Sequence, residues 1–227
     1  MASASQVNRA GKILRDWHRD PDAIVYGPRE IHALRVLSEF RASHSNALLK
    51  ANNGLRAMIR TEGCEVQVSQ RLKRTATIID KLLRHPSMAL STMQDIGGCR
   101  AVLNNIDEVR RVERRLTRNR HPVKVDDYVL KPQISGYRAV HIVVIYDDKR
   151  VEVQLRTRRM HQWAVSVEQL GSKIRHDLKN GLGPEPVLAW LAAIAEALAI
   201  EDEGKRIDGV MVQQILRLRE DAVPFIS

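Results

Sequence analysis

The segment 151–157, VEVQLRT, alternates strictly between apolar and polar side chains and constrains the fold more than any other part of the chain. Side chains two residues apart on a strand lie on the same face of a sheet. The apolar positions are Val151, Val153 and Leu155, and the polar positions are Glu152, Gln154 and Arg156. We therefore expect a strand with one face covered by helices and one polar face. A half-exposed strand without a binding role has the same pattern, so a binding role for this strand can be inferred only from other residues.

The remaining periodicities predict helices around such strands. Apolar residues at helical spacing predict helices at 8–19, 29–50, 76–84, 106–119, 158–171, 186–200 and 204–219. Alternation predicts strands at 65–73, 123–125, 137–146 and 150–156, and one more after Asp95. Together they predict an α+β fold, a mixed β-sheet flanked by helices, with helical extensions at both ends. The apolar run 187–200 predicts a helix that packs on the sheet or on the N-terminal helices, or else binds a partner.

Length and hydropathy predict a single domain. The chain has 227 residues, of which 44% are hydrophobic, enough for a substantial core. We expect one domain at 1–227, with a helical N-terminal extension at 1–55, a core at 56–172 and C-terminal helices at 185–222. No apolar run approaches the roughly 20 residues of a membrane-spanning helix, and the N-terminus lacks a signal-peptide core. Cys64 and Cys99 have no metal-ligand spacing, so we expect reduced thiols in a cytoplasmic protein without membrane association.

The net charge of +10 is concentrated in the middle of the chain. Residues 56–160 hold 22 lysines and arginines against 12 aspartates and glutamates, an excess of ten, while the charges of the two flanking regions cancel. A basic surface attracts polyanions such as nucleic acids. A solvated charged surface without such a partner has the same composition.

Basic residues gather where the strand at 65–73 meets the helix at 76–84. Arg71 and Lys73 share a strand face, and Thr77 and Lys81 share a helix face because they are four residues apart. Three cations and a hydroxyl at one junction suit a triphosphate. Asp95 lies in the following glycine-containing loop, where a carboxylate can hold Mg²⁺. Alone, each of these residues also fits a solvated edge or a loop cap.

A second polar group follows at Gly136-Tyr137-x-x-x-His141. This segment ends a loop and opens a strand, so Tyr137 and His141 are expected on one face. An aromatic ring at such a place can stack on a nucleobase. A tyrosine and a histidine are also ordinary strand residues.

In this order, the residues resemble the RelA/SpoT synthetase family, in its branch of small single-domain members. The family's runs are Arg-x-Lys-x-x-x-Ser-x-x-x-Lys, Asp-x-x-Gly-x-Arg, an Asp-Tyr-Ile loop ending in Gly-Tyr and then His, and Glu-Val-Gln-Ile-Arg-Thr. The similar residues here are Arg71, Lys73, Thr77 and Lys81; Asp95, Gly98 and Arg100; Asp127, Gly136, Tyr137 and His141; and the segment Glu152–Thr157. The resemblance covers about residues 50–172 and implies a nucleotidyltransferase-like synthetase fold.

The resemblance implies an ATP-dependent pyrophosphokinase that uses Mg²⁺ and moves the β,γ-pyrophosphate of ATP to a ribose 3′-hydroxyl. The implied ATP-binding residues are Arg71, Lys73, Thr77, Lys81 and Arg100. The implied catalytic residues and metal ligands are Asp95 and Glu152. The implied acceptor-binding residues are Gln133, Ser135, Tyr137, His141, Gln154 and Arg156. Such a transfer depends chiefly on positioning and on neutralising the charge of the moving group.

Two features bear on the acceptor. Members that make guanosine alarmones usually carry Pro-Lys-x-Asn-Gly-Tyr, where this chain has Gln133 and Ser135. The segment 161–168, HQWAVSVE, is similar to that of small members that include toxins acting on the 3′-terminal adenosine of tRNA. We therefore favour tRNA as the acceptor, and an antitoxin protein as a partner. The basic residues offered for the RNA are Arg110, Arg111, Arg114 and Arg118.

Two alternatives stay open. The first is a small alarmone synthetase acting on GDP, GTP or an adenine nucleotide, a type that often forms homo-oligomers. The second is a catalytically degenerate member that only binds RNA or a partner. Long members also carry a hydrolase domain with a His-Asp metal site. The only such pair here is His176-Asp177, so we expect no hydrolase domain.

Overall fold

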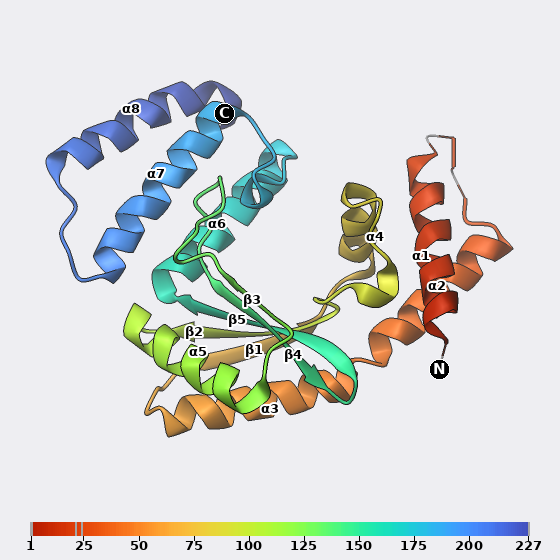
Figure 1. The fold of residues 1–227 in the computed structure, drawn as a ribbon. Coiled ribbons are helices and arrows are strands. Elements are labelled where there is room, and N and C mark those ends of the chain that lie inside the picture. Colours follow the sequence, from red (N-terminus) through yellow and green to blue (C-terminus); the bar gives the residue numbers. More distant parts are fainter. Residues whose placement is uncertain (1, 21, 24, 227) are drawn as a thin grey trace. The chain divides into compact units, whose positions relative to one another are not determined.

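A computed structural model describes residues 2–20, 22–23 and 25–226 (Figure 1). The strands are β1 Gln67–Leu72, β2 Gly97–Leu103, β3 Lys124–Asp127, β4 Val140–Tyr146 and β5 Lys149–Thr157. The helices are α1 Ala4–Arg19, α2 Pro28–Ala42, α3 Ser45–Thr61, α4 Thr75–Arg84, α5 Ile106–Arg120, α6 Arg158–Ile174, α7 Glu185–Asp202 and α8 Gly209–Ile226, with short 3-10 helices η1 Leu90–Thr92 and η2 Leu178–Asn180. The strands form one mixed sheet in the order β1-β2-β5-β4-β3, which confirms the expected α+β class.

The strand at 151–157 follows the predicted alternation as far as Gln154, whereas Arg156, expected on the polar face, is only 1% exposed. Val151, Val153 and Leu155 are at most 1% exposed, and Glu152 and Gln154 are half-buried. The turn before it lies at Asp147 and Asp148, which both have positive φ angles, as a tight right-twisting hairpin turn requires.

The predicted helix at 29–50 was wrong, because the structure has two helices there, α2 and α3, with a break at Ser43 and His44. The Ser43 hydroxyl donates to the carbonyl of Phe40 at 2.7 Å, and the His44 ring binds the same carbonyl at 2.9 Å. Short polar side chains that bind nearby backbone groups compete with the helical hydrogen bonds. Apolar spacing continues across this break, so periodicity alone does not reveal it.

The chain divides into two compact units, each built from several segments. Unit 1 comprises Met1–Leu55, Ser69–Cys99 and Val143–Val153. Its main core lies among α1, α2, α4 and η1, with Leu14, Leu37, Ile78 and Leu82 fully buried (Figure 1). This core holds α4 and the loop before β2, the two segments that carry Lys81 and Asp95.

Unit 2 comprises Arg56–Val68, Arg100–Ile142 and Gln154–Ser227. A core among α6, α7 and the loop before β4 includes Tyr137, Trp163 and Leu191, and the indole Nε1 of Trp163 donates to the carbonyl of Leu191 at 3.1 Å. Helices α7 and α8 pack on each other (Figure 1). Within unit 2, the apolar run in α7 thus packs mainly on α6 and α8, rather than on the strands of the sheet as the sequence analysis suggested. The apolar residues of this run predicted that one face of the helix is buried, but they did not predict which elements pack on that face.

Among the residues that the structure describes, none of the helices combines the length and apolar character that crossing a membrane requires. Cys64 and Cys99 are buried, and neither forms a disulfide among the described residues.

Candidate active site

Unit 1 brings Lys73, Lys81 and Asp95 together; we call this group the Asp95 cluster. Both ammonium groups lie 2.9 Å from Oδ2 of Asp95. Lys73 directly follows β1, Lys81 lies on α4, and Asp95 precedes β2. The backbone N–H of Lys73 donates to the carbonyl of Ile96 at 2.8 Å, which fixes the two loops against each other. The sequence predicted that Arg71, Lys73, Thr77 and Lys81 converge, and the structure brings Lys73 and Lys81 together on the carboxylate of Asp95.

The Asp95 carboxylate is ionised near neutral pH, and one of its two oxygens has no hydrogen-bond partner among the described residues. Burial acts to raise the pKa of Asp95, but the charges and hydrogen bonds of Lys73 and Lys81 outweigh burial and lower it. Its Oδ1 atom is buried and accepts no hydrogen bond from the described residues. Buried carboxylate oxygens normally have partners, so an unsatisfied one indicates a place for a ligand.

This carboxylate oxygen suits a hard divalent cation. The described residues contain no group of three or more His, Cys, Asp or Glu side chains that could enclose a metal ion. Mg²⁺ commonly binds through one or two carboxylates, several waters and substrate phosphates rather than in a protein cage. The unbonded oxygen of Asp95 therefore fits such a metal. Glu152, the other predicted ligand, is half-buried on β5 in the same unit.

The other residues predicted for ATP in unit 1 lie near this cluster in sequence but are not bonded to it. Arg71 is exposed on β1, and Thr77 is half-buried on α4, one turn before Lys81. Neither side chain makes a hydrogen bond or ion pair to Asp95 in the part of the chain that the structure describes. Their predicted role in binding the ATP phosphates stays a prediction.

In unit 2 the polar group forms around Tyr137. Its hydroxyl lies 2.7 Å from Nε2 of His141 and accepts a hydrogen bond from Arg156 Nη2 at 2.6 Å. Arg156 also donates to Oε1 of Gln154 at 2.8 Å. These contacts join four of the residues predicted for the acceptor, although Tyr137 precedes β4 rather than lying on it.

The ring of Tyr137 is not open for stacking in this conformation. Tyr137 is only 2% exposed, and Arg156 is 1% exposed. The guanidinium carbon of Arg156 lies 5.0 Å from the ring centroid and Nζ of Lys179 lies 5.1 Å from it, distances typical of cation–π contacts. Stacking of Tyr137 on a base therefore stays a prediction and requires the ring to be uncovered.

The loop that carries Gln133 and Ser135 is held under α7. Ser135 is fully buried, and its hydroxyl donates to the carbonyl of Lys179 at 2.9 Å. Gln133 is half-buried and closes a turn, since its carbonyl accepts from the N–H of Gly136 at 2.8 Å. Gly136 has φ +86°, and a Cβ there would lie 2.6 Å from Cβ of Ala195. Only glycine fits this position, for both conformation and space.

Arg100 belongs to a charged group in unit 2 that also contains Arg156, His161, Glu168 and Lys179. Burial, followed by the charges of Arg100 and Arg156, lowers the pKa of His161. Burial and the charge of Arg156 lower the pKa of Lys179, although its ion pair with Glu168 at 2.6 Å opposes this.

Sequence reasoning did not select Lys179 as a site residue. It lies in η2, outside every motif and any clear periodicity. A single lysine between two predicted helices has no sequence feature that would indicate a binding role.

Of the four arginines predicted to bind RNA, two have partners within the protein and two are exposed to solvent. Arg110 forms ion pairs with Glu113 and Asp127, at 2.7 and 2.6 Å, and Arg111 donates to the sulfur of Cys64 at 3.6 Å. Arg114 and Arg118 are exposed on α5. Two of the four are therefore engaged within the protein, and two face solvent one turn apart.

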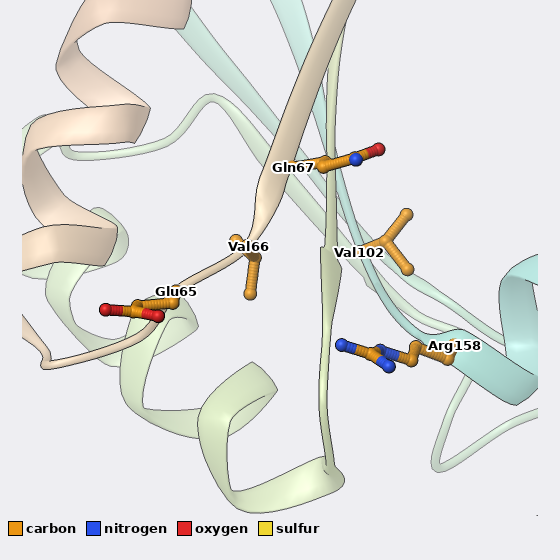
Figure 2. A pocket seen from close by; sticks show the side chains of 5 residues that line it. All are labelled: Glu65, Val66, Gln67, Val102 and Arg158. Carbon is orange, nitrogen blue, oxygen red and sulfur yellow. The ribbon is translucent and has the colours of Figure 1, made fainter.

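Unit 2 also contains an open cavity of about 550 Å³ at the start of β1, beside β2 and the first residue of α6. Its lining residues are Glu65, Val66, Gln67, Val102 and Arg158 (Figure 2). Figure 2 shows the carboxylate of Glu65 pointing away from Arg158. None of the residues predicted for either substrate lines this cavity.

Several known proteins are similar to this chain in sequence. The region found in RelA / SpoT proteins matches residues 70–173. GTP pyrophosphokinase YjbM of Bacillus subtilis (strain 168) is 34% identical over 148 residues, which cover 60% of this chain and 68% of that protein. GTP pyrophosphokinase of Escherichia coli (strain K12) is 30% identical over 223 residues, which cover 92% of this chain but only 29% of that protein.

Solved structures show the same similarity. The small alarmone synthetase 1 from Bacillus subtilis, bound to its product pppGpp, is 28% identical with a TM-score of 0.64, covering 75% of this chain and 94% of that one. The Type VI effector Tas1, solved with its immunity protein, is 13% identical with a TM-score of 0.52 and shares the fold alone.

Proposed function

The chain belongs to the RelA/SpoT family of pyrophosphokinases, and on that premise we propose that it transfers the β,γ-pyrophosphoryl group of ATP to the ribose 3′-hydroxyl of a free guanosine nucleotide. The relatives named GTP pyrophosphokinase and the neighbour bound to pppGpp support this acceptor. They support it better than the tRNA acceptor that the sequence alone favoured.

The observation that carries the proposal is the Asp95 cluster. Two ammonium groups are held 2.9 Å from one carboxylate oxygen while the other oxygen stays unbonded among the described residues. In our proposal, Asp95 and Glu152 hold Mg²⁺, which supplies positive charge to the ATP phosphates. Lys73, Lys81 and the exposed Arg71 add cations along the phosphate chain. Asp95 keeps the two lysines in place before ATP arrives, so little reorganisation is needed on binding.

The transfer itself needs positioning more than covalent chemistry. The acceptor's 3′-oxygen forms a bond to the β-phosphorus of ATP and gives up its proton. The bond between the β-phosphorus and the oxygen bridging to the α-phosphorus breaks, and AMP leaves with that oxygen. Glu152 is the carboxylate we propose to help align the hydroxyl or accept its proton. In unit 2, His141, Gln154 and Arg156 are the groups we propose for the acceptor.

A second acceptor is the 3′-terminal adenosine of tRNA, which would make the protein a translation-inhibiting toxin with an antitoxin partner. The exposed Arg114 and Arg118 on α5 support this reading, because phosphate-backbone binding relies on accessible cations. Arg110 and Arg111 give it less support, because they already have partners within the protein.

The test is to incubate the protein with Mg²⁺ and ATP labelled at the γ-phosphate, separately with GDP, GTP and deacylated tRNA. Label in a guanosine nucleotide, lost in Asp95→Asn, is the expected result. Label in tRNA alone would replace the acceptor and keep the donor chemistry. No label in any acceptor would favour the alternative that the protein is not an enzyme and only binds RNA or a partner.

A further inference from the structure

We propose that Lys179 and Glu168 form a subsite for the 5′-phosphates of the acceptor nucleotide, in which the phosphates displace Glu168 from Lys179. This inference rests on the proposed function, because it requires a free nucleotide as acceptor. Lys179 lies outside the matched region 70–173, and no motif of the sequence includes it.

The contacts of Lys179 place its ammonium group at the acceptor loop. Its backbone carbonyl accepts from the hydroxyl of Ser135 at 2.9 Å, and Nζ lies 5.1 Å from the ring centroid of Tyr137. The loop 132–137 itself, PQISGY, carries no charged side chain. Of the charged residues at the two ends of this loop, Lys131 is exposed and Arg138 pairs with Glu196. Lys179 in η2 adds a half-buried cation beside the loop.

The partner of Lys179 is exchangeable. Nζ of Lys179 lies 2.6 Å from Oε1 of Glu168, and the Glu168 side chain is 50% exposed while that of Lys179 is 21% exposed. Ion pairs at such a solvent boundary contribute little stability. A phosphate oxygen can replace the carboxylate on the ammonium group without leaving a buried charge unpaired.

The surrounding charge favours a polyanion over a single carboxylate. Arg100, Arg156 and Lys179 bring three positive charges against the one negative charge of Glu168, and Arg156 is almost fully buried. Nδ1 of His161, in the same group, is buried and has no hydrogen-bond partner among the described residues. The excess of two positive charges matches a nucleoside di- or triphosphate better than a monophosphate.

The experiment compares Lys179→Gln and Glu168→Gln with wild type, using GMP, GDP and GTP as acceptors at saturating ATP. Loss of one charged contact predicts a KM for GTP about 10-fold higher in Lys179→Gln, with a smaller change for GMP and none in the KM for ATP. Glu168→Gln removes the competing carboxylate and predicts a lower KM for GTP. Lys179→Arg keeps the charge and predicts a KM close to that of wild type.

Lys205→Gln is the matched control, since Lys205 forms an exposed ion pair with Glu203 at 2.7 Å and is expected to leave all three KM values unchanged. Equal changes for GMP and GTP in Lys179→Gln, or changes in the same direction in Lys179→Gln and Glu168→Gln, would show a structural role only and overturn the inference. Wild-type protein that labels no guanosine nucleotide would instead overturn the proposed function, and the inference with it.

Discussion

Lys73 and Asp95 are joined through a single carboxylate oxygen: Nζ lies 2.9 Å from Oδ2, an atom that also receives the ammonium group of Lys81, while Oδ1 remains unbonded among the described residues. One oxygen thus anchors the two lysines and the other is left for a ligand. With this division, one carboxylate can hold both lysines and still offer an oxygen to the metal that we propose.

Replacing Asp95 by asparagine tests this division. The amide keeps the shape but removes the charge that holds the lysines and the proposed metal. We expect kcat/KM for pyrophosphate transfer to fall about 100- to 1,000-fold, the loss typical of removing one electrostatic group from an active site. Asp80→Asn changes an exposed carboxylate on the same helix as Lys81 and serves as the control. Similar activity of Asp95→Asn and Asp80→Asn would contradict the metal-binding role.

The same variant gives a pH dependence with a defined sign. Lys73 and Lys81 lower the pKa of Asp95 in the folded state against the effect of burial. A lowered folded pKa stabilises the protein at pH above the unfolded value of about 3.9. This stabilisation is lost as the pH falls below that value through the folded pKa. In urea denaturation without metal, the stability difference between wild type and Asp95→Asn should be constant near neutrality and shrink in acid. If the stability difference between wild type and Asp95→Asn instead grew in acid, the pKa of Asp95 would not be lowered in the folded protein.

Gly136→Ala tests the close approach of α7 to the acceptor loop. A Cβ at Gly136 would lie 2.6 Å from Cβ of Ala195 and 2.8 Å from Cα of Ala192, at a φ of +86°. Strain and overpacking together predict a loss of about 2–4 kcal/mol in the free energy of unfolding. Gly204 has φ +74° with nothing within 4 Å of the added Cβ, so Gly204→Ala measures the conformational strain alone. Equal losses in the two variants would show that the contact with α7 contributes nothing.

Tyr137→Phe tests the hydroxyl that joins His141 and Arg156. Its removal takes one hydrogen bond from the almost fully buried Arg156, at 2.6 Å in the wild type. We expect a loss of about 1–3 kcal/mol in thermal or chemical denaturation, because a buried charged donor loses a partner. Tyr26→Phe is the control, since that hydroxyl lies 3.1 Å from the part-buried His18 and contacts no buried arginine in the part of the chain that the structure describes. If Tyr137→Phe is as stable as Tyr26→Phe, the hydroxyl does not organise the acceptor residues.

The elements that could be predicted are those with a local signal. Alternation at 151–157 identified the strand and its apolar buried side, and the motif spacing singled out Lys73, Lys81 and Asp95, which the structure brings together. Both depend on side chains that face the same way within one element or across one turn.

The features that were missed depend on contacts between distant segments. The break at Ser43 and His44 arises from side chains binding a backbone carbonyl, which apolar periodicity does not register. Lys179 reaches the acceptor loop only because η2 lies beside Ser135, 44 positions away along the chain. The burial of Tyr137 is likewise a result of packing by α6 and α7, so a sequence motif could indicate the tyrosine but not its environment.

The contact between Gly136 and α7 also sets an order of events during synthesis. The residues that cover Gly136, Leu191 to Ala195, are made more than 50 positions after it, and chains emerge from the ribosome N-terminal end first. Until those residues emerge, the loop 133–137 can pack only on α6 and η2, and the cover that α7 gives Tyr137 is missing. Nascent chains stalled before residue 191 should therefore have a more accessible Tyr137 than chains extended past α7.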